Sequence, residues 1–158
     1  MEIVLAGLTV LIDEDDLERV SSIRWRVNHK GIEKHNLAYF QGNIHMNGKY
    51  TTIRLHRYIM GCATGDGKIV DHINGNTLDN RKQNLRICTV SENSMNKKVR
   101  CDSVSGIKGV AFRHNKWLAT IVAEGKPLHL GYFMTKEEAI EAYAEASKKY
   151  HKEFGRTQ

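Results

Sequence analysis

The sequence predicts an α+β protein with two small domains, and three observations support this fold class. Short stretches of alternating apolar and polar residues recur over residues 8–55, as in the strands of an antiparallel sheet. Three further stretches follow residue 107 and lead into a helix with a capping-box start. Polar and basic residues separate the two sets. A chain of 158 residues is long enough for two small domains.

Residues 1–96 form the first predicted domain, which begins with a β scaffold over residues 1–60. The elements expected there are, in chain order, a strand at 8–12, a short acidic helix at 14–20 capped by Asp13, a half-buried strand at 24–27 and two strands at 37–46 and 49–55. The last two strands flank Asn47-Gly48, a pair typical of two-residue hairpins. These strands predict a small antiparallel sheet.

Residues 61–96 are predicted to form a ββα unit within the same domain. Its parts are, in order, a strand at 68–70 that leads into Asp71-His72, a polar loop around Gly75, a strand at 85–88 and a helix that begins at Thr89 or Ser91. Adjacent residues on a strand point to opposite sides. Asp71 and His72 can therefore serve one site only if the chain twists where they meet the loop.

A basic linker is predicted at residues 97–106, and residues 107–158 form the second predicted domain. Three strands are expected at 109–113, 116–122 and 126–133, joined by tight turns. Thr135 and Glu138 have the spacing of a capping box, and the apolar residues that follow recur at helical spacing. This segment predicts three antiparallel strands packed on one helix.

Positive charge is concentrated in the middle of the chain. The net charge is +6, and residues 51–100 hold nine Lys and Arg against four Asp and Glu. A basic region attracts polyanions, of which nucleic acid is the commonest. Charge alone equally fits a protein that is merely soluble. The three Cys residues have no C-x-x-C spacing, and no apolar run approaches the length of a membrane span, so we expect a cytoplasmic protein without a zinc knuckle or membrane contact.

Asp71 and His72, followed by Asn84 and Asn93, contain the groups that phosphodiester hydrolysis requires. A histidine can deprotonate water near neutral pH. The carboxylate of Asp71 and the amide oxygen of Asn93 are ligands that suit one Mg²⁺ or Mn²⁺ ion better than Zn²⁺. The ion would stabilise the charge that develops on phosphorus and on the leaving oxygen.

The segment from Leu55-His56-Arg57 to Asn93 resembles the HNH endonuclease family, and most of all its phage- and intron-encoded homing members. The runs that carry the resemblance are D-H-I-N-G-N at 71–76, D-N-R at 79–81, N-L-R at 84–86 and S-E-N at 91–93. The resemblance implies a ββα-metal core in which Asp71 and Asn93 bind the metal, His72 is the general base, and Asn84 braces the loop between the strands. Asn93 stands where many members have His, which further favours Mg²⁺ or Mn²⁺.

Each of these residues also has a plainer interpretation. Asp71 can be a turn residue, and Asn84 and Asn93 can be ordinary loop and helix-cap residues. His56 is expected to be a packed structural histidine rather than a catalytic one. The remaining basic residues near the motif are either DNA contacts or a solvated surface, and we predict contacts for Arg81, Arg86, Lys97, Lys98 and Arg100.

Residues 105–155 resemble the DNA-binding domain of plant ethylene-response-factor (Apetala-type) proteins. The matching runs are Gly109-Val110, Lys116–Ala119, Leu130–Phe133 and Thr135–Tyr143. The resemblance implies a sheet that enters the DNA major groove with the helix behind it. It implies base contacts from Arg113 and His129, and phosphate contacts are expected from Lys116 and Lys126.

This second segment also departs from the plant pattern. Ala111, Thr120 and Val122 stand where the plant family has charged residues, so its base preference does not carry over. Trp117 is expected to pack against the helix rather than touch DNA. Four residues are assigned to the core: Tyr132, Phe133, Tyr143 and Ala146.

The predicted function is a DNA endonuclease of the HNH family that uses one metal ion and a histidine base on double-stranded DNA. We expect a monomer that nicks or cuts at specific sites, in the cytoplasm of the host of a phage or mobile element. Whether the Arg24-Trp25-Arg26 strand adds DNA-binding surface or is only scaffold stays open. The alternatives are a DNA-binding protein with a degenerate, inactive nuclease core and an RNA-binding module.

Overall fold

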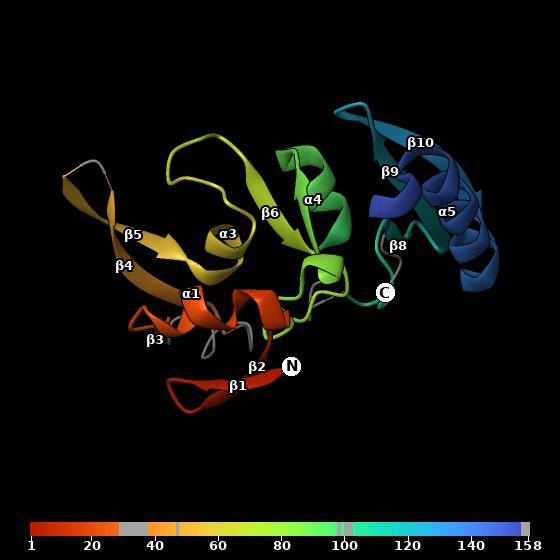
Figure 1. Cartoon of the computed structure of the whole chain (residues 1–158). Coiled ribbons are helices and arrows are strands. Elements are labelled where there is room, and N and C mark those ends of the chain that lie inside the picture. Colours follow the sequence, from red (N-terminus) through yellow and green to blue (C-terminus); the bar gives the residue numbers. More distant parts are fainter. Residues whose placement is uncertain (29–37, 47, 98, 100–102, 156–158) are drawn as a thin grey trace. The chain divides into compact units, whose positions relative to one another are not determined.

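Four small antiparallel sheets and several short helices make up the residues that the computed structural model describes, which are 1–28, 38–46, 48–97, 99 and 103–155 (Figure 1). The chain divides into two compact units, Met1–Thr89 and Val90–Gln158. The mixed helix and sheet composition agrees with the predicted fold class. None of the described helices is long and apolar enough to cross a membrane.

The first unit contains three of the sheets. Its elements are β1 (Glu2–Leu5), β2 (Leu8–Leu11), η1 (Glu14–Asp16), α1 (Leu17–Ser21), β3 (Arg26–Val27), β4 (Phe40–Met46), β5 (Lys49–Arg54), α3 (Leu55–Ile59), β6 (Ile69–His72), η2 (Lys82–Asn84) and β7 (Leu85–Cys88). β1 pairs with β2, β4 lies between β3 and β5, and β6 pairs with β7. One apolar core joins them, with Val10, Phe40, Leu55 and Leu85 among its buried residues.

Two elements of this unit were not expected from the sequence. β1 pairs with β2 from Glu2↔Leu11 to Leu5↔Leu8, and α3 follows β5 without a break. α3 has five residues, which is too short for helical periodicity to be detected, and only the packing of Leu55 and Ile59 into the core reveals it. Leu37 and Asn47, which belong to the predicted hairpin, lie outside the described residues.

Asp13 does not cap the acidic helix that follows it. Its side chain makes no capping hydrogen bond. Instead its Oδ2 accepts the backbone N–H of Lys82 at 2.7 Å. Asp16 is also buried, at 2% exposure, and forms ion pairs with Arg19 at 2.7 Å and Lys82 at 3.2 Å. Because a buried carboxylate is stable only when it is paired, the acidic segment is part of the fold of the unit rather than a solvated run.

The second unit consists of one sheet and its helices. Its elements are α4 (Val90–Asn96), β8 (Val110–Arg113), β9 (Lys116–Ala123), β10 (Lys126–Phe133), α5 (Lys136–Tyr150) and η3 (Lys152–Phe154). β9 lies between β8 and β10. The two connections are tight turns in which His114, Asn115, Glu124 and Gly125 all have positive φ, as type I′ hairpins require. Lys108 Nζ donates to the backbone oxygens of Ser94 and Met95 on α4, each at 2.8 Å.

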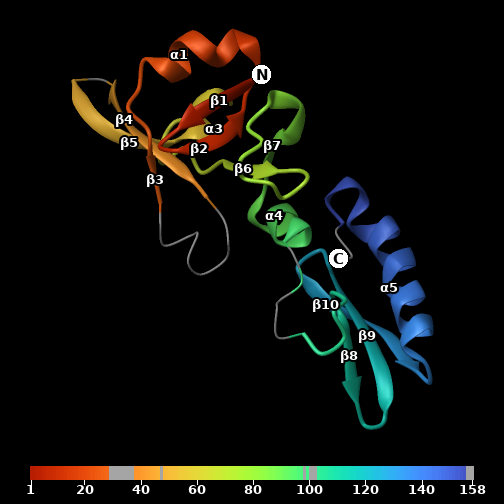
Figure 2. The same cartoon turned by 90° about the horizontal axis from the view of Figure 1, so that it is seen from below.

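α5 lies along one face of this sheet (Figure 2). It begins with the predicted capping box, in which Thr135 accepts from the Glu138 N–H and Glu138 accepts from the Thr135 N–H. Ala139, Tyr143 and Ala146 of the helix pack on Val110, Ala119 and Ile121 of the sheet. Gly109 makes this contact possible, because a Cβ there would lie 2.2 Å from the Tyr143 ring.

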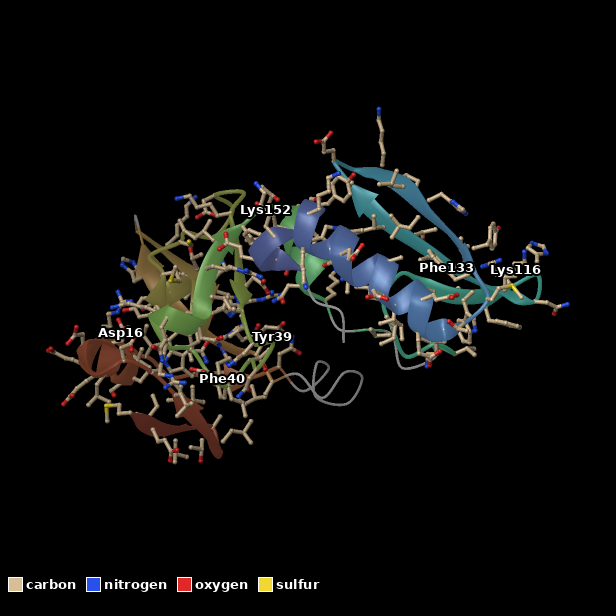
Figure 3. All side chains as sticks on the ribbon, turned by 90° about the vertical axis from the view of Figure 1, so that its right-hand side faces the viewer. Asp16, Tyr39, Phe40, Lys116, Phe133 and Lys152 are labelled. Atoms are coloured by element: carbon tan, nitrogen blue, oxygen red, sulfur yellow. The ribbon has the colours of Figure 1, made fainter. Side chains whose placement is uncertain are left out.

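The assignment of Tyr132 to this core is wrong. Tyr143 and Ala146 are buried, and Phe133 packs against the core from its edge (Figure 3). Tyr132, however, pairs with Leu118 on the face away from α5 and is 49% exposed. The cause is a register shift between His129 and Gly131. The bulge changes which residues of β10 face the helix, and the sequence did not reveal it.

Candidate functional site

The antiparallel pair β6 and β7 places the residues of the central motif next to one another. Asp71 lies opposite Arg86, and His72 lies opposite Leu85. His72 is 4% exposed, whereas Asp71 is half-buried. The strand pair ends there, because the Gly75 N–H bonds the oxygen of His72 at 2.9 Å and Gly75 has a φ of +70°. The chain therefore turns directly after the two candidate residues.

Asp71 forms an ion pair across the strands. Its Oδ2 accepts from Nε of Arg86 at 3.3 Å and from NH2 of Arg86 at 3.1 Å. Both side chains are largely enclosed, at 11% exposure for Asp71 and 13% for Arg86. Charge-assisted bonds of this kind are stronger than neutral ones. The Asp71 carboxylate is thus a cation-binding position, and in this structure the guanidinium of Arg86 occupies it.

His72 is oriented by Asn80. The Nε2 of His72 lies 3.3 Å from Oδ1 of Asn80, and the Nδ2 of Asn80 donates to the oxygen of Thr77 at 3.1 Å. Since the amide group of Asn80 uses its nitrogen for the carbonyl, it offers only its oxygen to the histidine. A neutral His72 that carries its hydrogen on Nε2 would donate to this oxygen, and its basic lone pair would then be on Nδ1.

Burial keeps His72 neutral. Desolvation lowers the pKa of His72 below its usual value, and the Asn80 hydrogen bond and the charges of Asp71 and Asp79 oppose that shift only in part. A neutral imidazole at neutral pH is the form that accepts a proton. Its position, its tautomer and its protonation state all suit a general base.

Asn84 bridges the two ends of the loop between β6 and β7. Its Oδ1 accepts the N–H of Asn74 at 3.0 Å, and its Nδ2 donates to the oxygen of Asp79 at 2.8 Å. Its backbone oxygen accepts from Ile73 at 2.9 Å. One side chain thus joins the start of the loop to its end.

The N-terminal hairpin holds the same loop from outside. The N–H of Leu11 donates to the oxygen of Leu78 at 2.8 Å, and the N–H of Asn80 donates to the oxygen of Leu11 at 2.8 Å. β2 therefore continues into a short parallel bridge with the loop at Asp79. This contact fixes the backbone of Asn80, the residue that orients His72.

Two rings, those of His56 and Tyr39, lie beside His72. The ring of His56 lies 5.1 Å from that of His72, and Tyr39 lies 5.7 Å from His56 and 6.3 Å from His72. His56 is buried, at 4% exposure. Burial, together with the nearby positive groups, lowers its pKa from 6.5 to about 3. These contacts are those of a packed, neutral histidine.

The low pKa of His56 makes the stability of this unit depend on pH. The folded pKa is depressed, so the unfolded chain binds more protons as the pH falls below 6.5, and folding stability is lost between pH 6.5 and about 3. We expect this one group to lower the free energy of unfolding by at most about 1.4 kcal/mol per pH unit in that range. Urea unfolding of wild type and His56→Phe from pH 7 to pH 5 measures it. An equally steep pH dependence in both proteins contradicts the expectation.

The other predicted site residues are distributed over both units. Arg81 is held by Asp79 through bonds of 2.8 Å from Nε and from NH2, and remains 35% exposed. Asn93 is half-buried on α4, in the second unit. Five further predicted contacts are exposed: Lys97, Arg113, Lys116, Lys126 and His129. Lys98 and Arg100 lie outside the described residues.

Sequence reasoning missed the role of Asn80. The residue belongs to the D-N-R run that was noted at 79–81, but only its contact with His72, eight positions earlier in the chain, shows what it does. Asp79 was missed in the same way, although its carboxylate joins Arg81 to Asn74. A sequence motif indicates that such residues act in one site, but it does not show which of their atoms are in contact.

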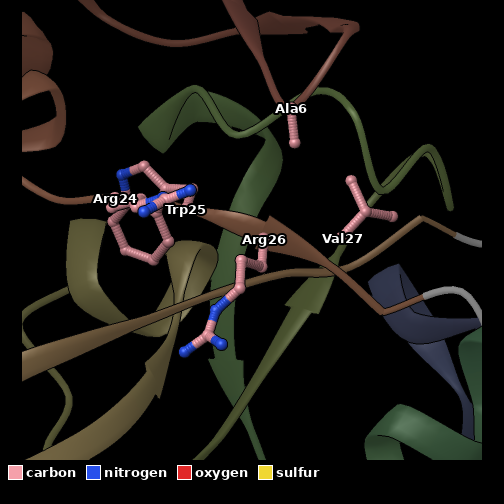
Figure 4. A pocket seen from close by; sticks show the side chains of 5 residues that line it. All are labelled: Ala6, Arg24, Trp25, Arg26 and Val27. Atoms are coloured by element: carbon pink, nitrogen blue, oxygen red, sulfur yellow. The ribbon is translucent and has the colours of Figure 1, made fainter.

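A hollow beside β3 is lined by residues other than those of the central motif. It is lined by Ala6, Arg24, Trp25, Arg26 and Val27 (Figure 4). Trp25 is buried, and its Nε1 donates to the oxygen of Val20 at 2.8 Å, whereas Arg24 and Arg26 are exposed. The alternation of exposed and buried side chains over residues 24–26 fits the predicted half-buried strand.

A metal ion fits the chemistry of the site. Among the described residues, no group of three or more His, Cys, Asp or Glu side chains lies together in a metal-binding arrangement. A Mg²⁺ ion, however, commonly takes one or two carboxylates and fills the rest of its shell with water and substrate. Asp71 offers one carboxylate that already attracts a cation. The donor set therefore suits a hard divalent ion held by few protein ligands.

Comparisons with known proteins agree with this site. A family model described as HNH endonuclease matches residues 54–95. Protein 3.8 of Escherichia phage T7 is 37% identical over 82 residues, which are 49% of this chain and 68% of that protein. An uncharacterized HNH endonuclease of Acanthamoeba polyphaga mimivirus is 28% identical over 142 residues, which are 87% of this chain and 67% of that protein. No solved structure matches the chain.

Proposed function

Since residues 54–95 match a family model described as HNH endonuclease, we propose that this chain is a metal-dependent endonuclease that hydrolyses phosphodiester bonds in duplex DNA. The observation that carries the proposal is the arrangement at the end of β6. There a buried neutral histidine with a defined tautomer directly follows a carboxylate that binds a cation. Such an arrangement places a base and a metal-binding carboxylate at adjacent positions of the chain.

His72 is the general base in this proposal. Its Nε2–H is held by Asn80, so Nδ1 takes the proton from the attacking water. Asn84 and the N-terminal hairpin keep the loop, and through Asn80 the imidazole, in place. The water then attacks phosphorus in line with the leaving 3′ oxygen, which gives 5′-phosphate and 3′-hydroxyl ends.

Asp71 and Asn93 would hold one Mg²⁺ or Mn²⁺ ion. When bound, the ion neutralises charge on the phosphate and stabilises the leaving oxygen. Arg86 competes for the same carboxylate, and it contributes a positive charge to the place where the phosphate would lie. The ββα-metal arrangement of β6, β7 and α4 is part of the proposal.

The second unit would bind the DNA. In the strands β8, β9 and β10, which the structure describes in full, there are three cations (Arg113, Lys116 and Lys126) and no Asp or Glu. α5 carries four exposed glutamates, Glu137, Glu138, Glu141 and Glu145, together with three lysines. Cations without neighbouring carboxylates in these strands give the sheet a surface that attracts phosphates. The resemblance to the plant ethylene-response-factor domain supports the same role.

The same proposal extends to the number of strands cut, the specificity of cleavage and the place of action. One site cuts one strand per binding event, so a monomer would nick, and a double-strand break would need a second event or a dimer. Site-specific cleavage of the homing type fits a nuclease core joined to a separate DNA-binding unit. The relatives from a phage and a giant virus favour the cytoplasm of an infected host as the place of action.

Supercoiled plasmid tests the activity directly. Incubated with Mg²⁺ or Mn²⁺, the protein should convert supercoiled DNA into the relaxed form before linear DNA appears. Removing the metal with EDTA should stop the conversion, and DNA ligase should reseal the nicks if the ends are 5′-phosphate and 3′-hydroxyl. A protein that leaves the plasmid intact under all metal conditions contradicts the proposal.

A DNA-binding protein with an inactive nuclease core is the second candidate. The Asp71–Arg86 ion pair favours it, because a guanidinium already occupies the predicted metal ligand. In that case the plasmid would be bound and retarded in a gel but never nicked.

A further inference from the structure

The face of the second unit's sheet that points away from α5 has an unusual composition. We call it the outer face. On β9 the residues 117, 119 and 121 pack toward the helix, so 118, 120 and 122 point outward. The strand register adds Ala111 opposite Leu118, His129 opposite Thr120, and Tyr132 opposite Leu118. Pro127 lies opposite Val122, so the centre of the outer face consists of Ala111, Leu118, Thr120, Val122, Pro127, His129 and Tyr132.

The outer face is accessible and lies among positive charges. Val122 is 50% exposed and Tyr132 is 49% exposed. The rings of His129 and Tyr132 lie 5.1 Å apart along β10. Arg113 and Lys116, which are cross-strand partners, extend the same face at the β8–β9 turn. The phosphates of a DNA duplex are attracted by this rim of cations. An apolar protein partner would gain nothing from it.

The centre of the outer face contains few groups for hydrogen bonding to bases. Arg, Lys, Asn, Gln, Asp and Glu make the strongest specific bonds to base edges in the major groove, and none of them occurs among these seven central residues. The side chains there that can form hydrogen bonds are those of Thr120, His129 and Tyr132. Its β9 positions are instead Leu118, Thr120 and Val122, which present methyl groups. The apolar group that a base edge offers in the major groove is the C5-methyl of thymine.

We propose that the outer face recognises thymine C5-methyl groups in the major groove, so that the protein prefers duplexes rich in A·T pairs. The inference rests on the proposed function of the second unit as a DNA-binding domain. Arg113 and Lys116, at the β8–β9 turn, bind the DNA from the end of this face and set the depth of the sheet in the groove. Leu118, Thr120 and Val122 then contact methyl groups and give selectivity.

The test compares duplexes that differ only in that methyl group. The full chain is kept in EDTA to prevent cleavage, and its affinity is measured by fluorescence anisotropy. One duplex has alternating A·T pairs, and the second has uracil in place of every thymine, which preserves all hydrogen-bonding groups. In the reverse comparison, a G·C duplex is prepared once with cytosine and once with 5-methylcytosine, so that the methyl group is added instead of removed. We expect the methylated member of each pair to bind about three- to ten-fold more tightly.

Three variants locate the effect. Val122→Ser, at an exposed position, should bring the ratio of the affinities for the thymine and uracil duplexes closer to one. Val4→Ser, which changes a 71% exposed valine of β1, should leave this ratio unchanged. The double variant Arg113→Ala/Lys116→Ala should weaken binding to both duplexes and keep their ratio. If wild type binds the thymine and uracil duplexes equally well, the inference is wrong and the proposed DNA binding stands. If it binds none of the duplexes, the proposed function of the unit fails as well.

Discussion

Replacing His72 with alanine is expected to reduce plasmid nicking by about 10²- to 10⁴-fold, the range that a general base contributes. The reason is specific to this imidazole, because Nδ1 is its basic atom when Asn80 holds the other nitrogen. DNA binding should be unaffected, since the proposed DNA-binding sheet belongs to the second unit. Initial nicking rates under saturating DNA and Mg²⁺ measure the effect, with gel retardation in EDTA as the binding readout.

Two controls separate catalysis from folding. His72 is buried against His56, so its removal leaves space in the unit. His72→Gln fills more of that space and cannot act as a base, and it should be as inactive as His72→Ala with a higher melting temperature. His45→Ala changes an exposed histidine of β4 and should nick like wild type. Nicking by a folded His72→Gln at the wild-type rate would exclude His72 as the base.

Replacing Asp71 with asparagine is expected to reduce plasmid nicking by a similar factor, because it weakens metal binding. Loss of the only charged ligand in the proposed site removes several kcal/mol of transition-state stabilisation, or more than about 10²-fold in rate. The variant keeps the shape of the side chain, so the strand pair should persist. Calorimetric titration with Mn²⁺ without DNA gives a readout that does not depend on cleavage, and the variant should lose the binding seen in wild type.

Arg86→Gln is the matched control, because it removes the other half of the same ion pair. If Asp71 is a metal ligand, this variant frees the carboxylate from its guanidinium, and Mn²⁺ should bind at least as tightly as in wild type. If Asp71 serves only as the partner of Arg86, both variants should lose stability equally and neither should change metal binding. That second outcome would support the inactive nuclease core instead.

Much of the architecture could be predicted because it depends on local patterns. The strands β8, β9 and β10 lie where their patterns and the turns between them predicted, and Thr135 and Glu138 form the capping box that their spacing predicted. Local patterns failed where a contact between distant residues decides the structure. The five residues of α3 are helical because of their packing, and the Asp13 carboxylate binds Lys82 instead of capping its own helix.

The candidate site shows the same division. The order of Asp71, His72, Asn84 and Asn93 was sufficient to indicate an HNH nuclease, and a family model and a viral relative agree. The roles of the four residues stay predictions. Asn80 received no role from the sequence, since its contact with His72 depends on how the loop folds back on β6.

The sequence by itself indicated the HNH-like segment, the strands and helix of the second unit, and which residue types are available for catalysis, because these depend on spacing and periodicity along the chain. Only the tertiary structure decided how the available groups are used. It pairs Asp71 with Arg86, gives His72 its tautomer through Asn80, and turns Tyr132 outward through a bulge in β10. The physical reason is that hydrogen bonds and ion pairs are short-ranged in space, so they depend on which residues the fold brings within about 3 Å.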